Sequence, residues 1–178
     1  MFPKRYADFV ARLRVPSGFA LVAAFVWFSH PSPLSMACGM PVSIAGLALR
    51  AWAAGHLAKN QQLAAGGPYA YTRNPLYLGT LLAAAGLAIA ARSVWLAVAF
   101  GAVFLLVYLP VIMLEEQHLR KLFPEYAAYA GSVPCLIPHR KPMPSAMRFR
   151  WDLYRKNEEY QALLAFLAGL AWLLWRAV

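Results

Sequence analysis

The stretch GGPYAYTRNPLYLG, from Gly66 to Gly79, gathers residue types that suit a ligand-binding loop. Gly67 allows backbone conformations and close approaches that a side chain would forbid, and Pro68 and Pro75 fix φ on either side. Tyrosine hydroxyls and π-faces, with the donor fork of one arginine, could contact a charged ligand. These residues are Tyr69, Tyr71, Tyr77 and Arg73. The pattern predicts a rigid, shaped loop, although interfacial tyrosines, an ordinary turn and a topology-setting arginine are the alternative interpretation.

Two adjacent carboxylates, Glu115 and Glu116, follow a long apolar run. We expect them to end a helix, where they would oppose its dipole, and ionised groups beside hydrocarbon are costly. A cationic or hydroxyl-rich partner is therefore expected. The alternative is that Arg120 and Lys121 pair with them along their own helix, which would stabilise it only weakly.

The sequence gives little support for a metal site, for the common nucleotide-binding motifs or for a nucleophile elbow. His118 and His139 lack suitably spaced cysteine or further histidine partners, so no metal site is predicted. The sequence also has no P-loop, no GxGxxG followed by an acidic residue, and no nucleophile elbow.

The elements that must position these residues are membrane helices. Of the 178 residues, 61% are hydrophobic and only 13% are charged, which is more apolar surface than one small core can bury. We therefore predict a single integral membrane domain over residues 1–178, an all-α polytopic helix bundle. Five spans are expected, at about 16–30, 37–57, 76–91, 94–114 and 161–175, joined by polar loops 58–75 and 115–160. Pro110 should bend the fourth span.

Basic residues alternate between the two ends of these spans. The N-terminal segment and the second and fourth loops hold most of the lysines and arginines, whereas the first loop holds none and the third only Arg92. Because positive loops remain cytoplasmic, we expect the N-terminus and both polar loops on the cytoplasmic side. The net charge of +10 then suits anionic headgroups, and no nucleic-acid partner is expected.

Three further expectations follow from this topology. The first span ends in HPSPLS, without a cleavage site, so it should stay in the mature protein. Cys38 and Cys135 should lie on opposite sides of the membrane, which disfavours a disulfide. Residues 148–160, RFRWDLYRKNEEY, space Phe149, Leu153 and Tyr160 like an interfacial helix, although a solvated linker is the alternative.

The two polar blocks together resemble the superfamily of isoprenylcysteine carboxyl methyltransferases and phospholipid N-methyltransferases. The resemblance rests on GGPYAYTRNPLYLG and, one helical hairpin later, on EEQHLRKLFPEYAAYAGSVPCLIP, and it covers about residues 60–138. It implies a helix bundle that binds S-adenosylmethionine at its cytoplasmic mouth, with a lipidic methyl acceptor and no metal. The expected location, with the topology above, is that of a multi-pass protein of the bacterial inner membrane with a cytoplasmic active site.

The resemblance also implies which residues contact the cofactor. These are Gln61, Gln62, Leu63, Ala64, Gly67, Tyr69, Arg73, Asn74, Pro75, Leu76, Tyr77, Glu115 and Glu116. The chemistry of the ligand agrees: a Glu carboxylate suits its ammonium or ribose diol, Arg73 or Asn74 suits its carboxylate, and tyrosine faces suit its sulfonium. Where the acceptor must lose a proton, Glu116 or His118 is the expected catalytic base.

Three positions depart from the family pattern. Asn74 stands where histidine is commoner, FPEY replaces Phe-Gly, and Val111 stands where the prenylcysteine branch has a substrate-binding arginine. The last departure leaves the acceptor open. Two other functions remain: a membrane reductase of the sterol type that uses NADPH, and a non-enzymatic assembly or lipid-binding protein.

Overall fold

The chain folds entirely into helices and connecting loops over the residues that the computed structural model describes, 4–138 and 147–178. The long elements are α1 (Lys4–Phe28), α2 (Pro33–Ala54), α3 (Pro75–Ala90), α4 (Val94–Val103), η2 (Phe104–Tyr108), α5 (Leu109–Leu122) and α8 (Tyr160–Ala177). The short elements are η1 (Gly67–Ala70), α6 (Tyr126–Ser132) and α7 (Trp151–Lys156). This confirms the all-α prediction for the described part of the chain.

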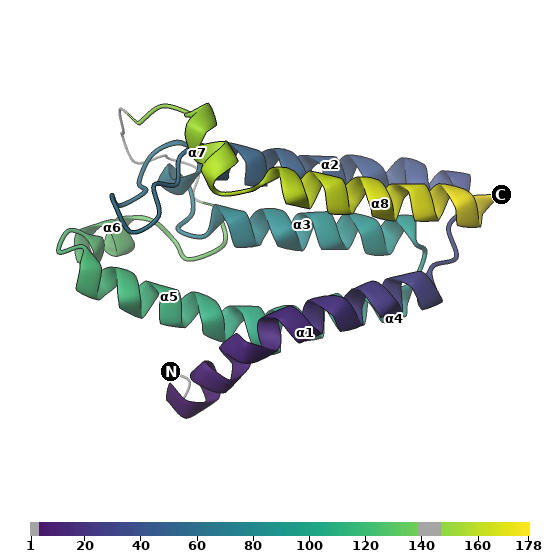
Figure 1. Cartoon of the computed structure of the whole chain (residues 1–178), viewed down its shortest axis with the longest axis horizontal. Coiled ribbons are helices and arrows are strands. Elements are labelled where there is room, and N and C mark those ends of the chain that lie inside the picture. The colour runs from purple at the N-terminus through teal and green to yellow at the C-terminus, as the bar shows by residue number, and fades with distance from the viewer. Residues whose placement is uncertain (1–3, 139–146) are drawn as a thin grey trace.

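The helices form two layers that meet at an angle (Figure 1). One layer holds α2, α3 and α8, and the other holds α1 packed against α4, η2 and α5. The polar segments η1, α6 and α7 gather at one end of the molecule, and the C-terminus lies at the other (Figure 1). Loop residues distant in sequence thus share one end of the bundle.

Small residues allow α2 and α3 to approach closely. A Cβ atom added to Gly46 of α2 would lie 2.6 Å from the carbonyl oxygen of Gly79 in α3. Nearby, the Ser43 hydroxyl donates to the Ala83 carbonyl at 2.9 Å. Such backbone proximity is the usual way in which helices associate where water is absent. It holds α3, and hence the loop that precedes it, in a fixed place on α2.

The fourth predicted span is one long helical run whose direction changes at η2 (Figure 1). The π-helical turn lies just before Pro110, which lacks an N–H group, so the expected bend occurs where π-turns and proline commonly produce one. The run continues to Leu122, however, because residues 117–122 are good helix formers. Glu115 and Glu116 therefore lie inside α5, and the prediction that they end the helix against its dipole is wrong.

Each predicted span falls on a helix, but the helices differ in length. Three are long and apolar enough to cross a membrane: Pro33–Ala54, Val94–Leu122 and Tyr160–Ala177. The segments Val15–Phe28 and Pro75–Ala90 are apolar but shorter. α1 also starts at Lys4, well before the predicted boundary. A membrane-embedded protein is supported, while five crossings and a cytoplasmic N-terminus stay predictions.

The basic segment before the last span is helical only in part. α7 ends at Lys156, and Asn157 donates to the carbonyls of Ala54 and Leu57, both at 2.9 Å, at the end of α2. Leu153 is buried, and the Phe149 ring packs against His56 at a centroid distance of 6.1 Å. These apolar residues therefore pack on the protein, so the prediction of one interfacial helix over 148–160 is only partly correct. His139 lies outside the described residues.

Candidate active site

The glycine-proline loop is shaped by His56. Gly67 has φ of 57°, a left-handed conformation that favours glycine, and an added Cβ would lie 2.5 Å from Nε2 of His56. The buried imidazole donates from Nδ1 to the Trp52 carbonyl at 2.9 Å, which fixes the ring against the loop. A glycine is therefore required at position 67 for two reasons, its backbone angle and the contact with the ring.

The second polar block closes over this loop from the other side. The Tyr129 hydroxyl donates to the Tyr69 carbonyl at 2.7 Å, and the Arg73 amide donates to the Pro134 carbonyl at 2.9 Å. The Thr72 hydroxyl is 3.0 Å from the Leu136 carbonyl. The two sequence blocks therefore form one interlocked structure.

Arg73 and Glu116 form the strongest polar contact between the blocks. Arg73 Nε donates to Oε1 of Glu116 at 2.8 Å, and Nη2 donates to Oε2 at 3.1 Å. Arg73 Nη1 also donates to the carbonyls of Ala130 and Val133, both at 2.8 Å. The expected cationic partner of the glutamate pair therefore comes from the loop. Arg120 instead lies over the Tyr126 ring, 5.5 Å from its centroid, so pairing along the helix does not explain Glu116.

Asn74 adds to the same junction. Its amide nitrogen is 3.0 Å from the Cys135 carbonyl and 3.3 Å from Oε1 of Glu116. Its donor group is thus directed at the protein. Burial raises the pKa of the nearby Cys135 thiol, as does the negative charge of Glu116, so the thiol form is favoured.

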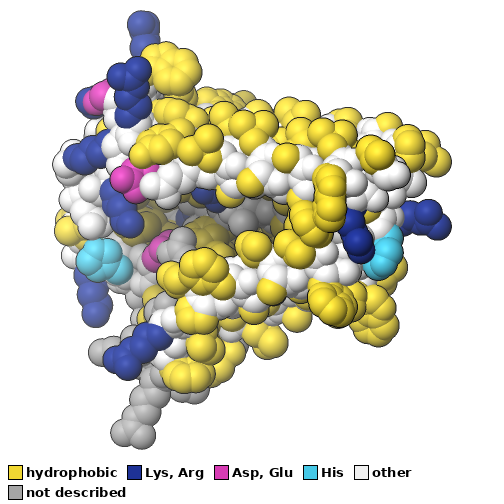
Figure 2. All heavy atoms as spheres, turned by 45° about the vertical axis from the view of Figure 1, so that its right-hand side comes forward, with side chains coloured by type: hydrophobic (Ala, Val, Ile, Leu, Met, Phe, Trp, Pro, Cys, Tyr) yellow, Lys and Arg dark blue, Asp and Glu magenta, His cyan; other side chains and the backbone are white. Residues whose placement is uncertain are grey.

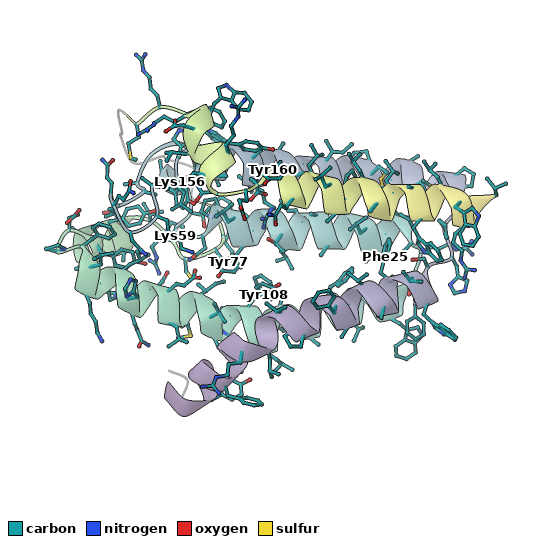
Figure 3. All side chains as sticks on the ribbon, in the orientation of Figure 1. Phe25, Lys59, Tyr77, Tyr108, Lys156 and Tyr160 are labelled. Atoms are coloured by element: carbon teal, nitrogen blue, oxygen red, sulfur yellow. The ribbon has the colours of Figure 1, made fainter. Side chains whose placement is uncertain are left out.

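Glu115 contacts a different partner. The Tyr77 hydroxyl donates to its Oε1 at 2.9 Å, and the Tyr77 ring meets the Tyr108 ring edge-on at a centroid distance of 6.0 Å. Tyr108 in turn lies parallel to Phe104, at 6.4 Å. Figure 3 shows Tyr77 and Tyr108 between the two layers, on the side facing the loops. A short path of aromatic residues therefore leads from the exposed carboxylate of Glu115 into the bundle.

The remaining predicted site residues surround this junction at different depths. Gln61 and Gln62 are exposed, Leu63 packs on the Tyr126 and Tyr129 cluster, and Ala64 packs on Tyr69. Pro75 and Leu76 begin α3, with Pro75 buried. Burial raises the pKa of the Tyr69 hydroxyl, which stays protonated and cannot act as a base near neutral pH.

The two predicted bases do not face one another. Glu116 and His118 are two positions apart on α5, and such residues project from different sides of a helix. Glu116 is held by Arg73, whereas the His118 side chain is exposed. They therefore remain alternatives and cannot form one catalytic pair.

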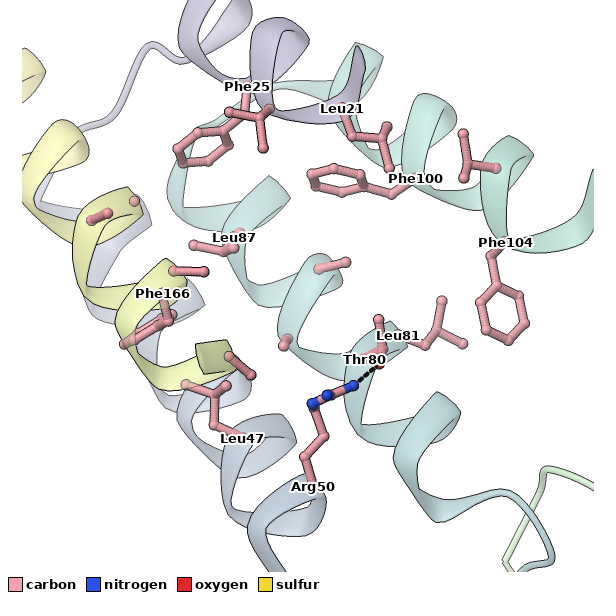
Figure 4. A pocket seen from close by; sticks show the side chains of 18 of the residues that line it. Leu21, Phe25, Leu47, Arg50, Thr80, Leu81, Leu87, Phe100, Phe104 and Phe166 are labelled. Atoms are coloured by element: carbon pink, nitrogen blue, oxygen red, sulfur yellow. Dashed lines mark hydrogen bonds between the residues drawn. The ribbon is translucent and has the colours of Figure 1, made fainter. Parts of the chain in front are cut away.

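An apolar cavity of about 730 Å³ lies between the two layers (Figure 4). Its walls come from α1, α2, α3, α4, η2 and α8, and they include Phe25, Leu87 and Phe166. Tyr108 lines it as well, which connects the cavity to the aromatic path below Glu115. Figure 2 shows a hollow between two ridges of hydrophobic side chains, with most of the basic side chains of that face at one end.

Sequence reasoning missed the polar end of this cavity. Arg50 lines it and forms a bidentate pair with Glu159, with contacts of 2.6 and 2.9 Å. A signal was present, because an arginine in the run SIAGLALRAW is costly inside a membrane segment and commonly marks a functional site. Glu159 is 109 positions away and had no comparable signal.

Comparisons with known proteins agree with the site. Residues 41–126, which include the loop and both glutamates, match the phospholipid methyltransferase family. The cobalt-zinc-cadmium resistance protein CzcN of Cupriavidus metallidurans is 37% identical over 110 residues, which cover 60% of this chain and 50% of that protein. The nickel-cobalt-cadmium resistance protein NccN of Alcaligenes xylosoxydans xylosoxydans is 31% identical over 113 residues, covering 62% and 48%.

The chain spans about half the length of these curated relatives. No solved structure matches it. The family match covers the glycine-proline loop and both glutamates, and it confirms the resemblance drawn from the two motifs. Residues 41–126 of this chain thus match the phospholipid methyltransferase family, which is part of the superfamily of membrane methyltransferases.

Proposed function

We propose that the protein is an integral membrane methyltransferase that uses S-adenosylmethionine and methylates a small lipidic acceptor. One observation carries the proposal: the Tyr77–Glu115 contact joins the loop block to the glutamate block beside Tyr108, which lines an apolar cavity. A polar site and an apolar chamber thus meet at one point. A soluble methyl donor and a lipid could be brought together there.

The donor set at the loop end fits the cofactor. When bound, S-adenosylmethionine supplies a methyl group on a positively charged sulfonium. The exposed carboxylate of Glu115 suits its ammonium or ribose diol, and the rings of Tyr77 and Tyr108 suit a cation. Backbone groups around Gly67 can approach a ligand closely because no side chain intervenes.

Arg73 and Asn74 have residue types that suit the cofactor carboxylate, but in this proposal they have a different role. Four of the five Arg73 N–H groups already bond Glu116 and two carbonyls, and the Asn74 amide also donates inward. These two residues support the pocket wall from behind. The exposed amides of Gln61 and Gln62 are then the better candidates for the cofactor carboxylate.

Positioning can supply much of the rate of such a reaction. The acceptor atom, the methyl carbon and the departing sulfur must be collinear, and a shaped, dry site favours this geometry. The fixed loop would hold the donor, while the cavity walls would hold the apolar part of the acceptor. His118 is exposed and unpaired with Glu116, so either residue would act as base alone.

We also propose that the site faces the cytoplasm across the bacterial inner membrane. The basic side chains near the loop end support this orientation, because positively charged loops remain cytoplasmic (Figure 2). The two relatives are named for metal resistance. Among the described residues of this chain, no group of three or more His, Cys, Asp or Glu side chains could hold a metal ion, and we propose no metal site.

Binding of S-adenosylhomocysteine to the purified protein in detergent tests the proposal. Calorimetric titration should detect binding, and Glu115→Gln should weaken it by about tenfold, the loss of one charge-assisted hydrogen bond. Glu125→Gln is the matched control, because Glu125 is an exposed carboxylate at the start of α6.

Three results would overturn the proposal. Binding of NADPH without S-adenosylhomocysteine would indicate a reductase instead. Failure of both ligands to bind would indicate a non-enzymatic protein. Equal effects of Glu115→Gln and Glu125→Gln would place the cofactor elsewhere.

A further inference from the structure

The cavity between the layers has a polar end and an apolar end (Figure 4). Arg50 and Thr80 lie at one end, whereas Phe25, Leu87 and Phe100 surround the other. Arg50 is the one charged side chain among the described residues that line this cavity. An amphiphile would therefore place its chain among the aromatic and aliphatic side chains and its head beside Arg50.

The positive charge of Arg50 is neutralised by a carboxylate that lies outside the cavity. Its Nε and Nη2 atoms donate to both oxygens of Glu159, at 2.6 and 2.9 Å, and Glu159 is only 8% exposed and does not line the cavity. The pair is fork-to-fork, which is the strongest geometry for an arginine and a carboxylate. The polar end thus carries no net charge.

Hydrogen-bonding capacity nevertheless remains at this end. Arg50 Nη1 donates to the Thr80 hydroxyl and, at 3.4 Å, to the Leu76 carbonyl, so four of five N–H groups are used. The Thr80 hydroxyl donates to the Leu76 carbonyl at 2.9 Å. One N–H group of Nη2 and one lone pair on the Thr80 oxygen are left, that is, one donor and one acceptor.

We propose that this polar end binds an amphiphile with an uncharged hydroxyl headgroup, and that this hydroxyl is the methyl acceptor. A hydroxyl can accept from Arg50 and donate to Thr80 at once. A carboxylate or an ammonium would enter an apolar cavity without a net opposite charge, and burying such a group is costly. The assignment of this hydroxyl as the acceptor rests on the proposed methyltransferase function, whereas the headgroup preference rests on the Arg50 site alone.

Transfer to a hydroxyl forms an O–CH3 bond as the S–CH3 bond of the donor breaks, with the bonding electron pair left on sulfur. The hydroxyl proton must leave at the same time. Tyr77 lies one helical turn before Thr80 on α3, contacts the cavity-lining Tyr108 and donates to Glu115. For a hydroxyl acceptor it therefore offers the proton a path to Glu115, in place of the two bases considered above. The products are a methyl ether, S-adenosylhomocysteine and a proton held by Glu115.

Titration of the 178-residue chain in detergent with 1-dodecanol and dodecanoate tests the headgroup preference without the methyl donor. The two probes share a twelve-carbon chain, and at pH 8 one carries an uncharged hydroxyl, which donates and accepts, and the other a carboxylate, which is charged and only accepts. The wild type should bind the alcohol at least about tenfold more tightly than the carboxylate, since a buried uncompensated charge is costly. Glu159→Gln frees the charge of Arg50 and should shift the ratio about tenfold towards dodecanoate.

Glu158→Gln is the matched control. It removes the same charge one position away, from an exposed side chain that accepts a hydrogen bond from Gln161, and should leave the ratio unchanged. Thr80→Val should weaken dodecanol binding about threefold to tenfold without weakening dodecanoate binding, because a carboxylate has no proton to donate to Thr80. This variant keeps the proposal testable if Glu159→Gln unfolds.

Equal or tighter binding of dodecanoate to the wild type would overturn the proposal, as would equal shifts in Glu159→Gln and Glu158→Gln. If S-adenosylhomocysteine fails to bind but the headgroup preference is found, the methyltransferase proposal falls and the ligand site stands. If S-adenosylhomocysteine binds but the headgroup preference is absent, the ligand-site proposal falls and the methyltransferase proposal stands.

Discussion

Two arginine–glutamate pairs, Arg73–Glu116 and Arg50–Glu159, share the same bidentate geometry but differ in what surrounds them. The side chains of the first are 13% and 15% exposed, and the remaining contacts of Arg73 are carbonyls of the second polar block. Those of the second are 23% and 8% exposed, and Arg50 also lines an apolar cavity. The first pair joins two loops, whereas the second joins helices α2 and α8 at the wall of a chamber.

This difference shows that similar ion pairs can have different roles. Arg73 bonds carbonyls that have no other described donor side chain, so its loss strands several buried groups. Arg50 shares the Leu76 carbonyl with the Thr80 hydroxyl, lines the cavity and has one N–H group left for a ligand. We therefore expect Arg73 to matter more for stability and Arg50 more for ligand choice.

The largest effect should come from Arg73→Met. It strands the Glu116 carboxylate and the carbonyls of Ala130 and Val133, so the free energy of unfolding should fall by about 3 kcal/mol. Denaturant unfolding in mild detergent measures the change. Arg120→Met, which removes only a contact with the Tyr126 ring, should cost less than about 1 kcal/mol. Equal losses in the two variants would contradict the role given to Arg73.

A smaller effect is expected for Arg50→Met. Only Glu159 loses its partner, because the Thr80 hydroxyl still donates to the Leu76 carbonyl, so we expect a loss of about 2 kcal/mol. The double variant Arg50→Met with Glu159→Leu should recover most of it, since removing both partners of a buried pair is often nearly neutral. Arg73→Met with Glu116→Leu should recover less, because the carbonyls stay unsatisfied. Denaturant unfolding in mild detergent measures both recoveries. Equal recovery of the free energy of unfolding in the two double variants would contradict the different roles given to the two pairs.

The smallest effect concerns the tyrosines around the first pair. Tyr129→Phe removes the hydrogen bond to the Tyr69 carbonyl and should cost about 1 kcal/mol at pH 8. Burial raises the pKa of both Tyr126 and Tyr129 above the ordinary value of 10.0. The unfolded chain releases these protons first, so their stabilisation is complete below pH 10 and is lost as the pH rises beyond it.

Unfolding between pH 8 and pH 11 measures this dependence, and Tyr129→Phe should reduce its slope. Tyr71→Phe removes a tyrosine hydroxyl at a half-buried position beside Trp52 and is the control for the substitution itself. An unchanged or steeper slope in Tyr129→Phe would contradict a pKa of this hydroxyl that burial raises.

Much of the fold could be predicted from the sequence because membrane helices are encoded locally, by runs of apolar residues. All five predicted spans fall on helices, and the bend before Pro110 occurs where the missing N–H group requires it. Helix ends were less predictable. α5 continues past Glu115 and Glu116 because its next residues favour a helix, and α7 ends where Asn157 binds the end of α2.

The candidate site, like the fold, could be predicted from the sequence only in part. The resemblance of the two motifs to a known family predicted that the loop from Gly66 to Gly79 and the Glu115–Glu116 pair belong to one site. The sequence also indicated that Arg73 could bind a carboxylate. That this carboxylate is Glu116, and not a ligand, depends on how α5 lies against the loop.

The sequence by itself determined the helices, their apolar faces and the two polar blocks, because each depends on residues close together in the chain. Only the tertiary structure decided which groups meet. Arg50 and Glu159 are 109 positions apart, and the cavity exists because two helical layers meet at an angle. Such contacts depend on distances between helices that no local pattern specifies.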